Sequence, residues 1–311
     1  MRGEHNRQAG RQAGPQLYAD VTAKIVAELE AGRVPWVQPW DGAKAGLGLP
    51  RNAATANAYS GINILILWSA VIERGFTVQN WLTFRQALSL GGHVRKGEKG
   101  VTLVYADRFT PKAERERAAA DGDEARSIPF LKRFTVFNVA QCDGLPGELL
   151  APPAILPESE TVPAAEALIT ATGAAFHVGG AMAFYMPSLD CIEVPPQAAF
   201  HEPVNYYRTC LHELGHWTGH PSRLARDLSG RFGSRAYAAE ELVAEMASAF
   251  VCAALGIVPT VRHADYIASW LDLLRDDDRA IFRAASLASK AADFLLAFRA
   301  EGIEPGEGRA A

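Results

Sequence analysis

The sequence has few cysteines and no long apolar run. Its 311 residues include four cysteines, and no two of them form a CxxC pair. This scarcity argues against a disulfide framework or a cysteine-bound zinc, and it is typical of a reducing cytoplasm. The longest apolar stretches, at residues 62–72 and 246–259, are too short to cross a bilayer, so we expect no membrane partner.

The two ends of the chain are polar. Residues 1–16 hold several arginines and no apolar segment follows them directly, which excludes a secretory signal and predicts a disordered leader. We expect residues 301–311 to form a flexible tail. Neither end is counted as part of a folded domain.

The net charge of −4 is small, but it is divided unevenly. Residues 1–150 contain 19 Lys and Arg against 15 Asp and Glu, whereas residues 151–311 contain 12 against 20. A mildly basic first half permits contact with nucleic acid, and an acidic second half argues against such contact there.

The length is sufficient for two domains with their own cores. Residues 149–163 are rich in proline and show little periodicity, so we predict a linker there between domains at residues 17–148 and 164–300. The charged segment at residues 110–127 indicates an exposed excursion or a hairpin tip. In the first domain we expect helices at residues 20–32, 61–74 and 83–90, and strands at residues 101–105 and 134–138.

Two histidines and a glutamate in the second half have the spacing of a metal site. From His212 to His216 the chain reads His-Glu-Leu-Gly-His. Successive helical residues turn by about 100°, so the two imidazoles lie on one face, one turn apart, and can bind one ion. Glu213 can take a proton from a metal-bound water, which makes it the candidate catalytic base. The motif predicts a zinc peptidase centre, although such ligands also accept manganese, cobalt or nickel.

The third ligand is predicted to be Glu241. It lies on an apolar helix with Glu245 four residues later, and this pair is similar to the Glu-x-x-x-Asp arrangement of thermolysin-like zincins. There the first acid binds the metal and the second orients a ligating histidine, which is the role we expect for Glu245. The alternatives are His220, Glu245 itself or Asp227. A further reading is that both glutamates are solvated first-turn charges.

Short strands are predicted ahead of this motif and helices after it. The segment Asp190–Pro195 looks like an edge strand ended by proline, and it could pair with an extended substrate or be a plain edge strand. A few strands, a metal helix and then more helices is the zincin order, an α+β architecture. The expected strands are at residues 174–178, 183–186 and 191–194, and the expected helices at residues 164–172, 205–218, 238–255, 264–276 and 279–299.

Blocks spread over most of the chain resemble the ArdC-type antirestriction proteins of conjugative plasmids and phages. The resemblance implies an N-terminal domain that binds single-stranded DNA and a C-terminal metallopeptidase-like domain related to the SprT-like proteases. It also implies a role in protecting incoming DNA from host restriction. The blocks are Trp36–Trp40, Pro50–Asn52, Tyr59–Asn63, Trp81–Ala87, Gly91–Gly100, His212–Leu224, Glu240–Ile257 and His263–Trp270.

The first half also has residue types suited to DNA. Single-strand binders combine aromatic platforms with Lys and Arg along a groove. Four of the six tryptophans lie in this half, and Trp68, inside an apolar helix, is expected to be core. Polar residues beside the aromatics could line the same surface. The candidate DNA contacts are Trp36, Trp40, Asn52, Tyr59, Asn63, Trp81, Arg85, Gln86, Arg95, Lys96 and Lys99.

Three functions remain open at this point. The favoured one is an antirestriction protein that binds single-stranded DNA, with double-stranded DNA as a further candidate, and that cleaves an unknown protein with a zinc centre. In the second, a DNA-binding shield carries a structural or idle metal site. In the third, a metallopeptidase uses its N-terminal domain to recognise protein.

Overall fold

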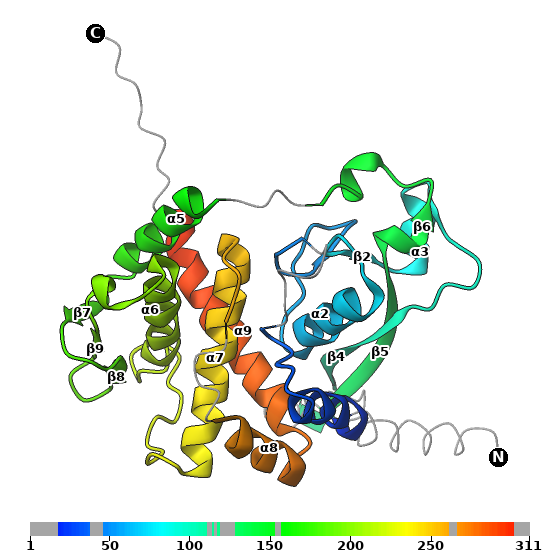
Figure 1. Ribbon diagram of the computed structural model, residues 1–311. Coiled ribbons are helices and arrows are strands. Elements are labelled where there is room, and N and C mark those ends of the chain that lie inside the picture. The colour runs from blue at the N-terminus through cyan, green and yellow to red at the C-terminus, as the bar shows by residue number, and fades with distance from the viewer. Residues whose placement is uncertain are drawn as a thin grey trace.

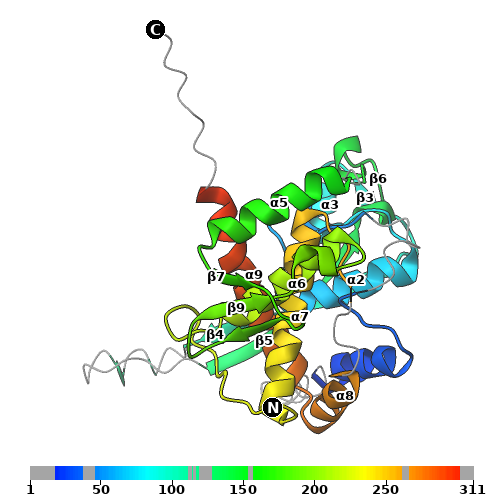
Figure 2. The ribbon, with the colours of Figure 1, turned by 60° about the vertical axis from the view of Figure 1, so that its left-hand side comes forward.

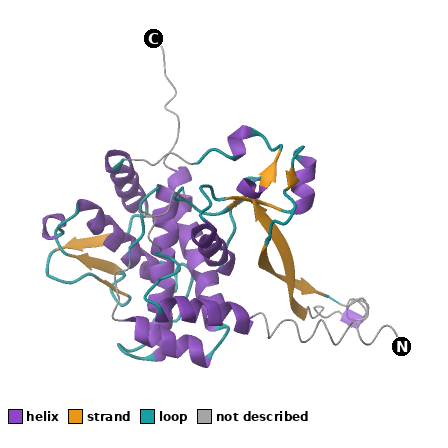
Figure 3. Ribbon diagram, turned by 45° about the vertical axis from the view of Figure 1, so that its right-hand side comes forward, coloured by secondary structure: helices purple, strands orange, loops and turns teal. Residues whose placement is uncertain are grey.

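The computed structural model describes residues 18–37, 46–110, 114, 117–118, 128–152, 157–260 and 266–301. It is a mixed α+β structure, as predicted, with two groups of strands at opposite ends and helices between them (Figure 3). The predicted leader lies outside the described residues, as do Trp40 and the tail after Glu301. Among the helices that the structure describes, none is both long enough and apolar enough to span a bilayer.

The first half pairs a mixed sheet with two helices. A helix at residues 18–30 precedes it, and the sheet order is β1-β2-β5-β4, with β1 and β2 parallel and the other pairs antiparallel. Strands β3 and β6 form a separate two-stranded sheet. The elements are β1 (Arg51–Asn52), α2 (Ile62–Arg74), β2 (Asn80–Leu82), α3 (Phe84–Ser89), β3 (His93–Val94), β4 (Val101–Phe109), β5 (Ile128–Asn138) and β6 (Cys142–Asp143).

Strands β4 and β5 form a long hairpin. Their register runs from Val101 opposite Val136 to Phe109 opposite Ile128. This pairing confirms that the charged segment between them connects a hairpin. Both strands extend beyond the predicted residues. The prediction stopped short because polar side chains interrupt the apolar pattern toward the tip, whereas the backbone hydrogen bonds continue there.

The second half follows the predicted order of strands and then helices. A three-stranded sheet, ordered β7-β9-β8, lies against α6 (Figure 2). Helix α5 begins six residues before its prediction: Glu158 and Glu160 favour its first turn, and Pro163 does not end it. The elements are α5 (Glu158–Ala171), β7 (Ala175–Val178), β8 (Phe184–Met186), β9 (Cys191–Val194), α6 (Pro203–Trp217), α7 (Arg235–Leu255), α8 (Ile267–Asp276) and α9 (Ala280–Glu301).

One apolar core joins the two halves. In Figure 1, α2 lies between the β4–β5 hairpin on one side and α7 with α9 on the other. Trp68 of α2 packs edge-on against Phe250 of α7, with ring centroids 5.6 Å apart, and is fully buried as predicted. The amide of Gly61 donates to Ser289 Oγ of α9 at 2.7 Å. The first half therefore helps to hold the helices that build the site described next.

Candidate metal centre

Helix α6 positions the predicted metal motif. It begins at Pro203, whose ring suits a first helical turn, and it ends at Trp217. A side chain at Gly215 would meet backbone atoms of Ala244 at 3.1–3.2 Å, so glycine lets α6 and α7 approach closely. The leucines Leu211 and Leu214 are fully buried in the core. Three polar side chains of the helix line a cavity in front of α7: His212, Glu213 and His216.

Helix α7 brings acidic residues to the same place. It begins after Ser234, whose hydroxyl accepts a hydrogen bond from the Tyr237 amide. Glu241 and Glu245 are 4% and 3% exposed, although they lie in the first half of a helix, where solvated acids are common. Buried carboxylates are costly unless charged or hydrogen-bonding groups face them. This burial rules out the reading of both residues as solvated first-turn charges.

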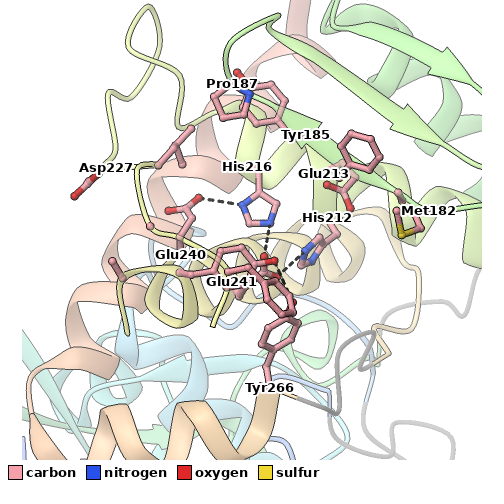
Figure 4. A pocket seen from close by; sticks show the side chains of 17 residues that line it. Met182, Tyr185, Pro187, His212, Glu213, His216, Asp227, Glu240, Glu241 and Tyr266 are labelled. Atoms are coloured by element: carbon pink, nitrogen blue, oxygen red, sulfur yellow. Dashed lines mark hydrogen bonds and ion pairs between the residues drawn. The ribbon is translucent and has the colours of Figure 1, made fainter. Parts of the chain in front are cut away.

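Three side chains converge on one point. Glu241 Oε2 lies 3.5 Å from His212 Nε2, and Glu241 Oε1 lies 3.5 Å from His216 Nε2. One ligand atom from each residue lies within 4.8 Å of the other two. Figure 4 shows both imidazoles directed toward the Glu241 carboxylate. Ligand atoms around a tetrahedral zinc ion are about 3.4 Å apart, so the spacing fits a divalent ion.

Each imidazole has a second carboxylate on its other nitrogen. His212 Nδ1 lies 3.1 Å from Glu245 Oε2, and His216 Nδ1 lies 3.2 Å from Glu240 Oε1. Arg226 donates to both oxygens of Glu240 at 2.7 and 3.0 Å. Carboxylates in this position fix the ring and its tautomer so that Nε2 faces the metal.

Glu240 was missed by sequence reasoning. Two adjacent acids at the start of a helix gave no sign that both point at the histidines. The available signal was the arginine at position 226, because a buried guanidinium between the two helices requires a buried acid.

Tyr237 supports the remaining ligand. Its hydroxyl lies 3.0 Å from that of Tyr266 and is hydrogen-bonded to Glu241. Burial raises the pKa of Tyr237 well above its usual range, and the bonds to Tyr266 and Glu241 raise it further. The phenol therefore keeps its proton and can donate a hydrogen bond to Glu241. Each of the three ligands thus has its own orienting partner.

The charges are balanced without metal by protonated imidazoles. Burial alone would lower the pKa of His212, but the carboxylates of Glu241 and Glu245 raise it to about 9. For His216, burial acts in the same downward direction, and Glu240 and Glu241 raise the pKa to about 10. Burial would raise the pKa of Glu241, yet the two imidazoles hold it well below its usual range. Two protons carry the charge of one divalent ion, so the donor set fits a metal that replaces them.

The other candidate ligands lie apart from these three. His220 follows the end of α6, and its Nδ1 lies 2.7 Å from Ser222 Oγ. Asp227 lines the cavity, but its carboxylate accepts hydrogen bonds from the amide and hydroxyl of Ser229. The metal site is His212, His216 and Glu241.

A cavity of about 530 Å³ opens over the metal site. Glu213 lines it and is 4% exposed, beside the ligand His212. Strand β8 and the residues just before and after it form one wall, and the segment before α7 forms another. The cavity gives a substrate access to Glu213 and to the metal site.

The prediction for Asp190–Pro195 as an edge strand is wrong. Strand β9, which contains most of this segment, is central: Ile192 pairs with Phe176 of β7 and with Tyr185 of β8. Proline after a strand marks where pairing stops, and it does not report which strands lie beside it. Strand β8 is at the edge of this sheet and lines the cavity.

Two tryptophans predicted to contact DNA are buried. Trp36 and Trp81 are both 0% exposed. Trp36 packs edge-on against Trp270, with ring centroids 5.5 Å apart, and Trp81 packs against Phe76 at 5.7 Å. No face of either ring is open to a base in this structure, so both act in packing. Trp40 lies outside the described residues.

Most of the predicted polar contacts hold local structure. Asn52 and Gln86 exchange two side-chain hydrogen bonds of 3.2 Å, and Asn52 Nδ2 lies 3.4 Å from the hydroxyl of Tyr59. Asn63 bonds the amide and the carbonyl of Val104 at 3.0 and 2.8 Å. These half-buried groups tie β1 to α3 and α2 to β4.

The basic residues divide into engaged and exposed ones. Arg95 forms ion pairs with Glu98 at 2.8 Å and with Asp143 at 3.4 Å. Phe84, in the first turn of α3 after the Thr83 cap, is 51% exposed, and the sequence analysis did not single it out. The exposed basic side chains of the predicted set are Arg85, Lys96 and Lys99.

Known proteins resemble the chain over both halves. A family model described as "N-terminal domain of anti-restriction factor ArdC" matches residues 15–137. A second, described as "Zincin-like metallopeptidase", matches residues 163–287. The uncharacterized protein y4eC of Sinorhizobium fredii (strain NBRC 101917 / NGR234) is 43% identical over 92% of this chain and 93% of its own. The DNA primase TraC of Escherichia coli is 40% identical over 93% of this chain but only 28% of its own length.

Solved structures agree with these matches. The metal-free crystal structure of the antirestriction protein ArdC from the R388 plasmid is 41% identical, with a TM-score of 0.76, over 93% of this chain and 99% of that one. The Mn(II)-bound structure of the same protein is 40% identical, with a TM-score of 0.75, over 92% and 99%. The chain belongs to the ArdC antirestriction protein family, with an ArdC N-terminal domain followed by a zincin-like metallopeptidase domain.

Proposed function

We propose that this protein protects mobile DNA from host restriction, binds single-stranded DNA through its first half and hydrolyses a protein through its metal centre. The observation that carries the peptidase part is the convergence of His212, His216 and Glu241 beside Glu213 in an open cavity. A metal site that only stabilised the fold would need neither the cavity nor Glu213.

The catalytic role of this site falls mainly to Glu213. A bound divalent ion would polarise a peptide carbonyl and a water, and zinc would lower the pKa of that water to about 7. Glu213, which lines the cavity beside His212, would accept a proton from an attacking water and return it to the leaving amine. Glu240, Glu245 and Tyr237 hold the ligands in place, so that the geometry does not change during the reaction.

DNA binding is proposed for the exposed part of the first half. Arg85, Lys96 and Lys99 supply charge for phosphates, and Phe84 supplies an aromatic face for a base. The name of the relative TraC, a DNA primase, agrees with a DNA partner. We assign DNA binding to residues 17–148 and the peptidase to residues 164–300. The scarcity of cysteine supports action in the cytoplasm.

The test compares wild-type protein with Glu213→Ala in three assays: metal content, single-strand binding and protection of transferred DNA from a restriction nuclease. Glu202→Ala removes an exposed acid at the start of the same helix and is the control. We expect Glu213→Ala to keep its metal and its DNA affinity and to lose protection. Full protection by this variant would instead favour a DNA-binding shield.

A further inference from the structure

A second pocket, of about 470 Å³, lies where the helix at residues 18–30 meets α9. Figure 1 shows this helix (dark blue) beside the beginning of α9, and the rings of Tyr18 and Phe282 meet edge to face with centroids 4.6 Å apart. The hydroxyl of Thr22 donates to the carbonyl of Asp278 at 2.6 Å, which ties the two segments together. The pocket is therefore built by both halves of the chain.

Two arginines line this pocket, and no acid lines it among the residues that the structure describes. The guanidinium of Arg279 lies 5.0 Å from the centre of the Tyr18 ring, and no carboxylate of the described residues pairs with it. Arg283 pairs with Asp277 at 2.5 Å through one nitrogen, and its side chain is 58% exposed. A guanidinium has five N–H donors, so both arginines keep donors for a further anion.

The exposed side of α9 continues this positive charge. Arg283 and Lys290 are seven residues apart, which places them two turns apart on one side of the helix, and both are exposed. Together with Arg279 they form what we call the α9 basic face. Ser286, between them, borders the first half, because a side chain at Gly61 would lie 3.9 Å from its Cα atom. The α9 basic face therefore lies at the seam between the two halves.

The charge of this face is opposite to that of its surroundings. Residues 151–311 contain 20 Asp and Glu against 12 Lys and Arg, a composition that argues against contact with nucleic acid. The described lining of the metal cavity includes four acids and neither Lys nor Arg. A polyanion is therefore repelled from the peptidase centre and attracted to the α9 basic face. The average composition conceals this separation of charge on the surface.

The pocket combines the two features of a single-strand binding site. Arg and Lys contact phosphates, and aromatic rings pack against bases. Tyr18 and Phe282 are both partly exposed and supply the rings. An acidic protein segment would use the charges but has no planar group for the rings. The chain ahead of Tyr18 contains three Arg and one Glu, so like charge argues against that segment as the occupant.

We propose that single-stranded DNA also contacts the second half of this protein. Its phosphates bind the α9 basic face, and one base packs against the aromatic wall of the pocket, formed by Tyr18 and Phe282. A volume of about 470 Å³ lies within the roughly 300–1,000 Å³ of small-ligand sites, which suits one nucleotide. This inference rests on the proposed binding of single-stranded DNA and adds a contact region outside the first half.

The phosphate contacts are tested by fluorescence anisotropy with the full-length protein and a labelled single strand of mixed sequence, over a range of salt concentrations. For single strands, the logarithm of the binding constant falls with that of the salt concentration, with a slope of about −0.7 for each phosphate contacted. Arg279→Gln and Lys290→Gln should each weaken binding severalfold and make this slope shallower by about 0.7. Arg299→Gln removes the same charge from the opposite side of the same helix and should leave the slope unchanged.

The base contact is tested separately. Tyr18→Leu keeps an apolar side chain against Phe282 but removes the aromatic ring. It should weaken binding by about fivefold or more and leave the salt slope unchanged. A strand that carries 5-iododeoxyuridine should crosslink under ultraviolet light to Tyr18 or Phe282, and mass spectrometry of the digested complex identifies the position. Thermal unfolding checks that each variant is folded.

Three results would overturn the inference. The first is wild-type affinity and slope in both Arg279→Gln and Lys290→Gln. The second is an equal loss in Arg299→Gln, which would show an effect of net charge alone. The third is displacement of the strand by an acidic peptide of equal charge at equal concentration, which would make this face a surface for an acidic protein.

Variants of the first half separate this inference from the proposed function. If Lys96→Gln and Lys99→Gln weaken binding and the α9 variants do not, DNA binding by the first half stands and the inference fails. If only the α9 variants weaken binding, the inference stands and the assignment of DNA binding to the first half fails. If the wild-type protein binds no single strand, both fail.

Discussion

The two halves of this chain differ in how directly their sequence reports their chemistry. In the second half, His212 and His216 lie one helical turn apart, and that spacing brings both imidazoles to Glu241. In the first half, Trp36 and Trp81 follow a pattern typical of DNA binders, yet both are buried. The spacing of the two histidines is local geometry, because helix α6 alone fixes it. The exposure of an aromatic ring depends on what packs over it, and in the case of Trp36 that includes α8.

The largest expected effect is the loss of a ligand. His212→Ala removes one of three ligand atoms and leaves Glu245 buried with no imidazole beside it. We expect metal content to fall to background. Substitution of an orienting residue lowers metal affinity by roughly 10–100-fold, and the loss of a ligand should lower it further. Metal analysis of purified protein measures it. His220→Ala is the matched control and should bind normally. If His220→Ala lost its metal, the site would not be the one described.

A second pair of variants tests packing against DNA contact in the first half. Trp36→Ala should destabilise the protein by about 3–5 kcal/mol, because the ring fills the core between the halves. Phe84→Ala should change stability by less than about 0.5 kcal/mol, since the ring is exposed. It should weaken single-strand binding by about 1–3 kcal/mol. Denaturant unfolding and fluorescence anisotropy measure the two effects. Loss of DNA affinity in a fully folded Trp36→Ala protein would contradict this division.

The orienting acids should have intermediate effects. Glu240→Gln keeps the size of the side chain but removes the charge that faces His216 and Arg226. We expect metal affinity to fall by about 10–100-fold. Asp227→Asn removes a charge from the same cavity without a contact to either imidazole, so it controls for electrostatics alone. Calorimetric titration with Mn(II) compares them, and equal losses in both variants would refute an orienting role.

The last prediction concerns the dependence of stability and metal affinity on pH. The pKa values of about 9 for His212 and about 10 for His216 lie above the ordinary 6.5, so protonation stabilises the metal-free fold. That contribution is complete below pH 6.5 and is lost as the pH rises through about 9 and 10. Metal must displace these protons, so its affinity should rise with pH over this range. Calorimetry in two buffers of different ionisation enthalpy should count about two protons released near pH 7.5. No proton release would show that the imidazoles are neutral without metal.

Much of the second half could be predicted because its signals are local. Pro203, the histidine spacing and the break after Trp217 define α6, and the apolar run of α7 defines its partner. The order of strands in the sheet could not be predicted, because β9 is central only through pairings with β7 and β8. The role of Glu240 was hidden for a related reason: it depends on how α7 is rotated against α6.

The first half shows the same limit more strongly. The helices α2 and α3 follow from apolar spacing and from the Thr83–Gln86 capping box. The burial of Trp36 requires α8, which is more than two hundred residues later in the chain. No local pattern contains that contact.

The position of the metal tests the central claim most directly. Crystals of the wild-type protein soaked with Mn(II) would locate the ion by its anomalous scattering. We predict one strong peak about 2.0–2.3 Å from His212 Nε2, His216 Nε2 and a carboxylate oxygen of Glu241, with Glu240 and Glu245 still on the outer nitrogens. A peak at His220 or Asp227, or none at the three residues, would contradict the account.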